Sequence, residues 1–144
     1  MLRQHIPYRA RLLKDGLRPF GAFNQQDNQA AEAGIVSGRI LLSFLGLGCD
    51  GATVKLTVAD RKHRCRQNLT DDVKAPDVGG RFVELSELTP DECETLAKFI
   101  HGANKACAHF TMGSEHELTV PIFQLAVPII LRILRDCLPV AQLP

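Results

Sequence analysis

The stretch TPDECETLAKFIHGANKACAHF, residues 89–110, decides the fold. It opens with a capping box, in which the side chains of Thr89 and Glu92 each bond the other's backbone N–H, and Pro90 takes the first helical position. Six apolar side chains then recur every three or four residues: Leu96, Phe99, Ile100, Ala103, Cys107 and Phe110. This spacing predicts a helix that begins after Thr89, buries one face and ends near residues 111–113.

Three further segments carry helical patterns. One spans roughly residues 6–17, with Pro7 in its first turn. Another spans roughly residues 28–45, with Asp27 as its N-cap. The last begins at about Thr119 or Pro121, runs to Leu138 and is apolar nearly all round, which is typical of a central helix.

The helix over residues 28–45 carries a stripe of small residues. Ala30, Gly34 and Gly38 are spaced i, i+4, i+8 and therefore share one face. Each glycine inside a helix costs about 1 kcal/mol relative to alanine. We therefore predict that another helix approaches this face closely.

The connection over residues 46–88 has weaker patterns. Gly46-Leu47-Gly48 is typical of a helix stop. Alternating apolar residues indicate a short strand at Val54, Leu56 and Val58, and a weaker one at Phe82 and Leu85. The predicted fold is mainly α: a four-helix bundle whose long 46–88 connection has room for a short β-hairpin.

Length and composition fit one soluble domain. The 144 residues form a single helical-bundle domain over 1–144, with its core at roughly 24–138. Hydrophobic residues make up 45% and charged residues 23%, which argues against a disordered chain and against a coiled coil. The most apolar stretch, at 118–134, has about 17 residues and two prolines, whereas a bilayer span needs roughly 20 apolar residues. No membrane contact is expected.

The five cysteines are widely spaced, and no C-x-x-C motif occurs. An odd number of cysteines without metal-ligand spacing is most simply explained by reduced thiols in a cytoplasmic protein. We expect no metal and no cofactor.

Charge is divided unevenly along the chain. Residues 1–66 hold 11 Lys and Arg against 5 Asp and Glu, a net of +6, whereas residues 67–144 hold 6 against 11, a net of −5. In one interpretation the two halves dock and offset each other's field. In the other, a basic face binds an anionic partner. Positive charge is densest at Arg61, Lys62, Arg64 and Arg66.

A polar stripe runs along the helix of residues 89–110. His101, Lys105 and His109 are spaced i, i+4, i+8. The simpler interpretation is a solvated face. If the stripe instead lined a cleft with Arg39 or the basic run, the neighbouring lysine would favour a neutral imidazole, which can act as a base.

The run NKACAHFT, residues 104–111, lies near the end of this helix and resembles the motif of the HEPN domains (higher eukaryotes and prokaryotes nucleotide-binding). That signature is an arginine, usually an asparagine, three residues and a histidine. By position, His109 matches the histidine, Asn104 stands where the arginine is expected, and Lys105 takes the polar position. The segment from Ala30 to Leu45 is similar to an early helix of HEPN bundles, and the resemblance covers roughly residues 24–138.

The resemblance implies a homodimer that binds RNA. Many HEPN domains are metal-independent ribonucleases of toxin–antitoxin or phage-defence systems, and others bind without catalysis. In the active case His109 would act as base or acid, and Lys105 would steady the phosphate. The expected RNA contacts are Arg61, Lys62, Arg64, Arg66 and His101.

Two other functions are compatible with the same residues. One is a catalytically inert helical protein that associates with itself or with a protein partner, through the glycine-lined helix or the apolar last helix. The other is an α+β domain that binds a small molecule, if residues 53–85 form a sheet.

Overall fold

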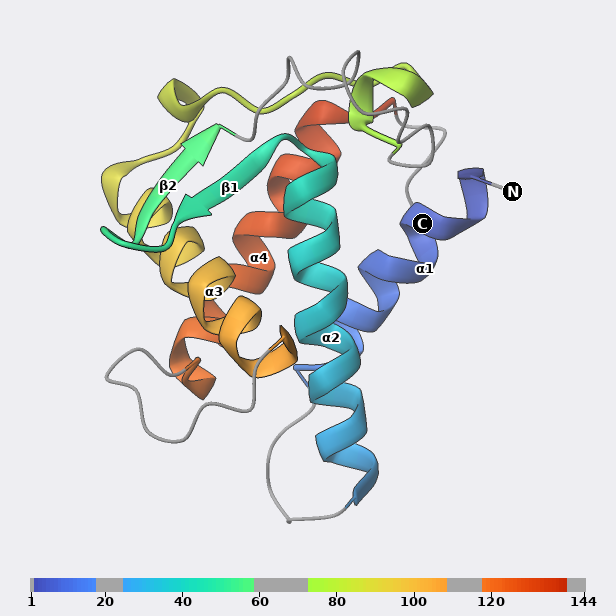
Figure 1. Cartoon of the computed structure of the whole chain (residues 1–144). Coiled ribbons are helices and arrows are strands. Elements are labelled where there is room, and N and C mark those ends of the chain that lie inside the picture. Colours follow the sequence, from blue (N-terminus) through green and yellow to red (C-terminus); the bar gives the residue numbers. More distant parts are fainter. Residues whose placement is uncertain (1, 18–24, 59–72, 109–117, 140–144) are drawn as a thin grey trace.

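The computed structural model describes residues 2–17, 25–58, 73–108 and 118–139 (Figure 1). Its α-helices are α1 (Leu2–Asp15), α2 (Gln25–Phe44), α3 (Pro90–Ala108) and α4 (Val120–Cys137). Two short strands, β1 (Leu47–Asp50) and β2 (Lys55–Val58), follow α2, and two 3-10 turns, η2 (Ala75–Val78) and η3 (Leu85–Glu87), precede α3. The prediction of a mainly helical protein with a short hairpin between residues 46 and 88 is confirmed.

The start of α3 follows the predicted capping box. The backbone N–H of Thr89 donates to Glu92 Oε2 at 2.9 Å, and the backbone N–H of Glu92 donates to Thr89 Oγ1 at 3.2 Å. The helix is described as far as Ala108, so its expected end at residues 111–113 lies outside the described residues.

Two helices begin earlier than predicted. α1 begins at Leu2, so Pro7 lies inside the helix rather than in its first turn, and the helix loses one backbone donor there. α2 begins at Gln25, so Asp27 is a helical residue and not the N-cap.

α3 is enclosed more completely than α4. α3 contacts α2, α4 and both strands, and between Leu96 and Ala103 only Lys98 is exposed. α4 contacts all three other helices, yet it buries only one face, and Leu125 on the opposite face is 60% exposed. The expectation that the last helix is enclosed on all sides was therefore wrong, because an apolar composition does not place a neighbour on every face of a helix.

The predicted close approach to α2 is confirmed, and α1 is the approaching helix. A Cβ atom added to Gly34 would lie 3.1 Å from Gly16 Cα and 3.2 Å from the Leu12 carbonyl oxygen. One added to Gly38 would lie 2.7 Å from Phe99 Cζ. We call Gly16, Gly34 and Gly38 the glycine crossing.

Two aromatic rings close the core beside the glycine crossing. Phe99 of α3 and Phe123 of α4 are stacked, with ring centroids 6.0 Å apart and an interplanar angle of 13°. Phe123 Cζ would lie 3.0 Å from a Cβ at Gly34. All four helices therefore meet at this point of the core.

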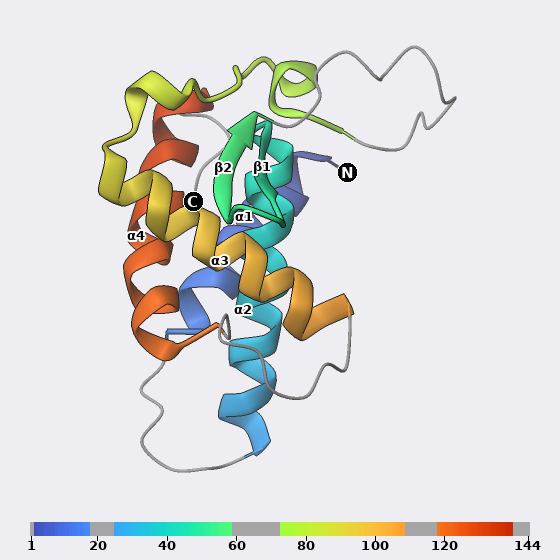
Figure 2. The ribbon, with the colours of Figure 1, turned by 60° about the vertical axis from the view of Figure 1, so that its left-hand side comes forward.

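The hairpin uses a different partner strand from the one expected. β2 pairs antiparallel with β1, in a register that places Leu47 opposite Val58, and not with residues 82–85. The Asp50 carboxylate holds the turn, accepting from the Ala52 N–H at 3.0 Å and the Thr53 hydroxyl at 2.6 Å. Figure 2 shows the hairpin lying over α3, which both strands contact.

Candidate functional site

A pocket of about 440 Å³ opens between the first half of α1, the last half of α2 and the segment before η2. In Figure 1 these segments surround the upper right of the molecule. The pocket is lined by His5, Ile6, Arg9, Arg39, Ile40, Leu41, Ser43, Phe44, Val73 and Lys74.

Helical spacing brings these side chains to one place. His5 and Arg9 are four residues apart on α1, and Arg39 and Ser43 are four residues apart on α2, so each pair shares one helix face. Ile40 lies beside this row and is 41% exposed. The pocket consequently has a charged side and an apolar side.

The charged side is positive. Four of the described lining residues carry basic side chains, and none of the described lining residues is acidic. We call His5, Arg9, Arg39 and Lys74 the basic cluster.

Lys74 is held in place by neutral oxygens. Its ammonium donates to the carbonyl oxygen and to the hydroxyl of Ser43, both at 3.1 Å. Ser43 lies at the C-terminal end of α2, where the helix dipole favours a cation. These two bonds fix the ammonium at the pocket without neutralising its charge.

The residues expected on a polar stripe of α3 lie in different environments. His101 is 8% exposed and therefore lies inside the protein. Lys105 is half-buried. Asn104 is also half-buried, and its Oδ1 atom has no hydrogen-bond partner within the described ranges.

The remaining predicted site residues lie outside the described residues. They are His109 of the motif and Arg61, Lys62, Arg64 and Arg66 of the basic run. Their assignment to the site therefore stays a prediction.

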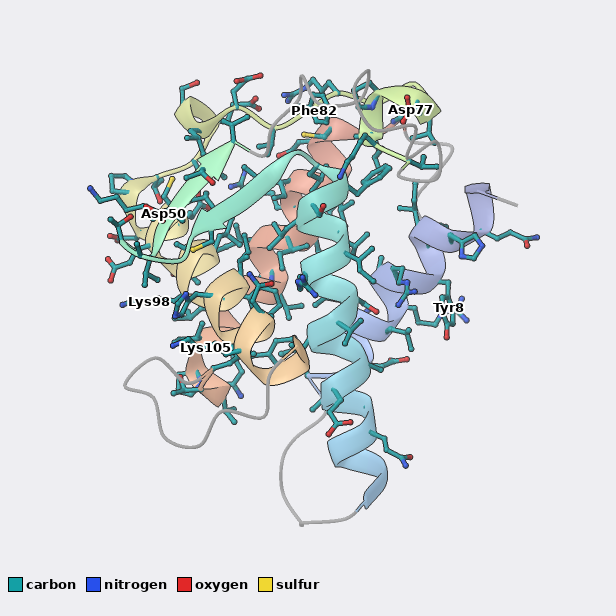
Figure 3. The ribbon with its side chains drawn as sticks, in the orientation of Figure 1. Tyr8, Asp50, Asp77, Phe82, Lys98 and Lys105 are labelled. Carbon is teal, nitrogen blue, oxygen red and sulfur yellow. The ribbon has the colours of Figure 1, made fainter. Side chains whose placement is uncertain are left out.

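The pocket and the end of α3 are separate places. Figure 3 shows Lys98 and Lys105 on one side of α2 and Tyr8 of α1 on the other. Arg39 lines the pocket beside α1 and does not share a cleft with Lys105 in the described part of the chain. Sequence reasoning did not single out His5, Arg9 or Lys74; the basic excess of residues 1–66 was the available signal for Arg9 alone.

A smaller pocket of about 300 Å³ lies between the hairpin and α3. Its lining includes Lys55, Glu94 and the thiol of Cys93. Cys49, Cys93 and Cys137 are free thiols. Burial raises the pKa of the Cys137 thiol, which disfavours the reactive thiolate.

The described residues contain no group of three or more His, Cys, Asp or Glu side chains that could hold a metal ion. None of the helices in the described ranges is long and apolar enough to cross a membrane. No protein-family model, no curated protein and no solved structure matches the chain.

Proposed function

We propose that the protein is a HEPN-like helical protein that binds RNA through its phosphates, with the basic cluster as a principal phosphate site. The observation that carries this proposal is a pocket with four basic side chains and no acidic side chain among its described lining residues. Such a surface attracts the phosphates of RNA. Binding is favourable because each phosphate that pairs with a cation releases counterions from the strand.

The sequence around the pocket supports the same function. Val73 and Lys74 line the pocket, and the basic run from Arg61 to Arg66 ends seven positions before Val73, with Asp71 and Asp72 in between. The four cations of the run outnumber these two acids, so the sequence before Lys74 adds net positive charge.

RNA cleavage is a separate part of the proposal and rests on the resemblance. His109 would transfer the proton, Lys105 would steady the phosphate and Asn104 would occupy the arginine position, in a homodimer and without a metal ion. His109→Ala would then abolish turnover of a labelled single-stranded RNA in the presence of a chelator. Equal turnover by the parent and His109→Ala would refute this assignment.

Salt-dependent binding of a fluorescent single-stranded RNA tests the main proposal. Arg9→Gln/Arg39→Gln removes two charges from the basic cluster, whereas Arg11→Gln/Arg135→Gln removes two exposed charges that do not line the pocket. The first variant should bind at least about tenfold more weakly, and its slope of log affinity against log salt should be shallower by about 1.4. Equal loss in both variants would contradict a specific phosphate site.

Association with a second copy of the chain is the alternative function. The observation that favours it is the exposed apolar surface of α4, where Leu125 is 60% and Val120 40% exposed. Leu125→Asp should shift sedimentation equilibrium toward the 15.9 kDa monomer, and Gln124→Asp, at the exposed neighbouring position, should not. A parent protein that sediments only as a monomer at tens of micromolar would refute a stable dimer.

A further inference from the structure

We propose that the pocket recognises a nucleoside phosphomonoester, presented either by the end of an RNA strand or by a free nucleotide. The strand-end form of this inference rests on the proposed RNA binding. The phosphate would lie among Arg9, Arg39 and Lys74, and the nucleoside against the apolar side of the pocket.

The size and shape of the pocket favour one nucleotide over a passing strand. Its volume of about 440 Å³ falls in the range of small-molecule sites. At one end the space between α1 and α2 is closed by the glycine crossing, where a Cβ on Gly34 would already touch Gly16 Cα. A strand that entered between the helices could not continue past this point.

The amount of positive charge favours a terminal phosphate. A phosphomonoester carries about −1.5 to −2 charges at neutral pH, whereas each internal phosphodiester carries a single charge. Arg9 and Arg39 form no ion pair with any described residue, and Arg9 lies over the Tyr8 ring, 6.0 Å from its centroid. The Lys74 ammonium donates to the neutral oxygens of Ser43, whereas the Lys74 backbone N–H donates to Asp77 Oδ2 at 2.7 Å. The lining therefore offers more charge than one phosphodiester can neutralise.

The apolar side of the pocket favours an anion that carries a larger body. Ile6, Ile40, Phe44 and Val73 line the same space as the basic cluster. Ile6 and Phe44 are buried, whereas Ile40 is 41% exposed and Val73 is half-buried. Inorganic phosphate would leave Ile40 and Val73 uncovered, whereas the ribose and base of a nucleotide would cover them. Arginine can also grip a phosphate with two parallel hydrogen bonds, which gives a terminal phosphate a defined orientation.

Binding of three versions of one RNA oligonucleotide tests the proposal: one with a 5′-phosphate, one with a 3′-phosphate and one with hydroxyls at both ends. Adenosine 5′-monophosphate and adenosine form a second pair of probes. At least one phosphorylated strand, and the nucleotide of the second pair, should bind about tenfold or more tightly than the matching hydroxyl compound. Arg39→Gln should abolish this preference, and Arg135→Gln should preserve it.

The outcomes separate this inference from the proposed function. Equal binding of all three strands, with no preference for the nucleotide over adenosine, would overturn the inference and leave RNA binding intact. Binding of the nucleotide without binding of any strand would uphold phosphomonoester recognition and overturn the proposed function. Arg39 and Arg135 are both exposed, and unchanged thermal melting of the two variants would show that the fold is intact.

Discussion

The two ends of the α1–α2 pair differ sharply. At one end Gly16 and Gly34 let the two backbones meet, and the rings of Phe99 and Phe123 seal the contact. At the other end the helices diverge (Figure 1), and the side chains between them surround a pocket of about 440 Å³. We refer to these as the closed end and the open end of the pair.

Side-chain size and charge account for the difference. The closed end is built from residues without a side chain, so that van der Waals contact extends to the backbone. At the open end, like-charged side chains from α1 and α2 line the same space, and their repulsion opposes closer approach of the two helices. One helix pair therefore provides stability at one end and a binding surface at the other.

The largest effect should come from a bulky residue at the closed end. Gly34→Leu should lower the free energy of unfolding by about 3 kcal/mol, because two of its three nearest neighbours are backbone atoms that cannot rotate away. Glu32→Leu places the same side chain on the exposed face of α2 and should change stability by less than about 0.5 kcal/mol. Urea unfolding measures both, and similar losses would show that α1 does not constrain position 34.

A second substitution distinguishes side-chain contacts from backbone contacts at the closed end. Gly38→Leu should cost about 2 kcal/mol, because its nearest neighbours are the Phe99 ring and the end of Leu13. Phe99→Leu replaces the ring with a smaller side chain and should relieve the clash with the new side chain at position 38. The double variant should therefore recover part of the lost stability, with a coupling energy between the two substitutions of about 1 kcal/mol or more. Strictly additive unfolding energies in the double-mutant cycle would contradict direct contact.

A substitution at the N-cap of α3 tests how much the capping box stabilises this helix, which supplies Phe99 to the closed end. Thr89→Ala should cost about 1 kcal/mol, because Thr89 Oγ1 accepts the Glu92 N–H at the start of α3. Thr119 is the matched control, since it is the N-cap of α4 but its side chain makes no capping bond. Thermal melting should show a lower midpoint only for Thr89→Ala, and equal shifts would refute the role of the cap.

The smallest effect should come from the open end. Arg39→Gln should change the free energy of unfolding by less than about 0.5 kcal/mol, because Arg39 forms no ion pair with the described residues. Arg132→Gln should cost up to about 1 kcal/mol, since its guanidinium bonds Glu92 at 2.8 Å and joins α4 to α3. A larger loss for Arg39→Gln would mean that the basic cluster stabilises the fold.

The close contact at the closed end could be predicted from the sequence, whereas the nearly complete burial of α3 could not. The capping box at Thr89 and the i, i+4 spacing of Gly34 and Gly38 are local patterns, and both have the predicted consequence. Whether α3 or α4 is enclosed on all sides depends on tertiary neighbours. The apolar composition of α4 predicted burial all round, but Leu125 is exposed.

β1 was missed for a similar reason. Gly46 does end α2, with a φ of 82°, but the glycine at position 48 also reads as a turn residue. The strand forms because Leu47 is buried and pairs with Val58 eleven residues later. Pairing partners of this kind are not encoded in the short apolar run itself.

The open end was not predicted because its parts are distant in the chain. His5 and Arg9 lie beside Arg39 only because α1 packs on α2. Lys74 comes from the segment before η2, 35 positions after Arg39 in the chain. Each residue alone is an ordinary surface cation. The expected RNA contacts of residues 61–66 and the expected base His109 lie outside the described residues and stay predictions.

The pairing of neighbouring elements has a consequence for folding kinetics. α1 packs on α2, β1 on β2, and α3 on α4, so most partners are close in the chain and little loop entropy opposes their contact. What remains is the docking of the N-terminal half on the C-terminal half, where α2 and the hairpin pack on α3 and Phe99 lies beside Gly38. Their opposite net charges, +6 and −5, attract the two halves at that step. We therefore expect refolding to slow as salt is added, even though the native core is apolar.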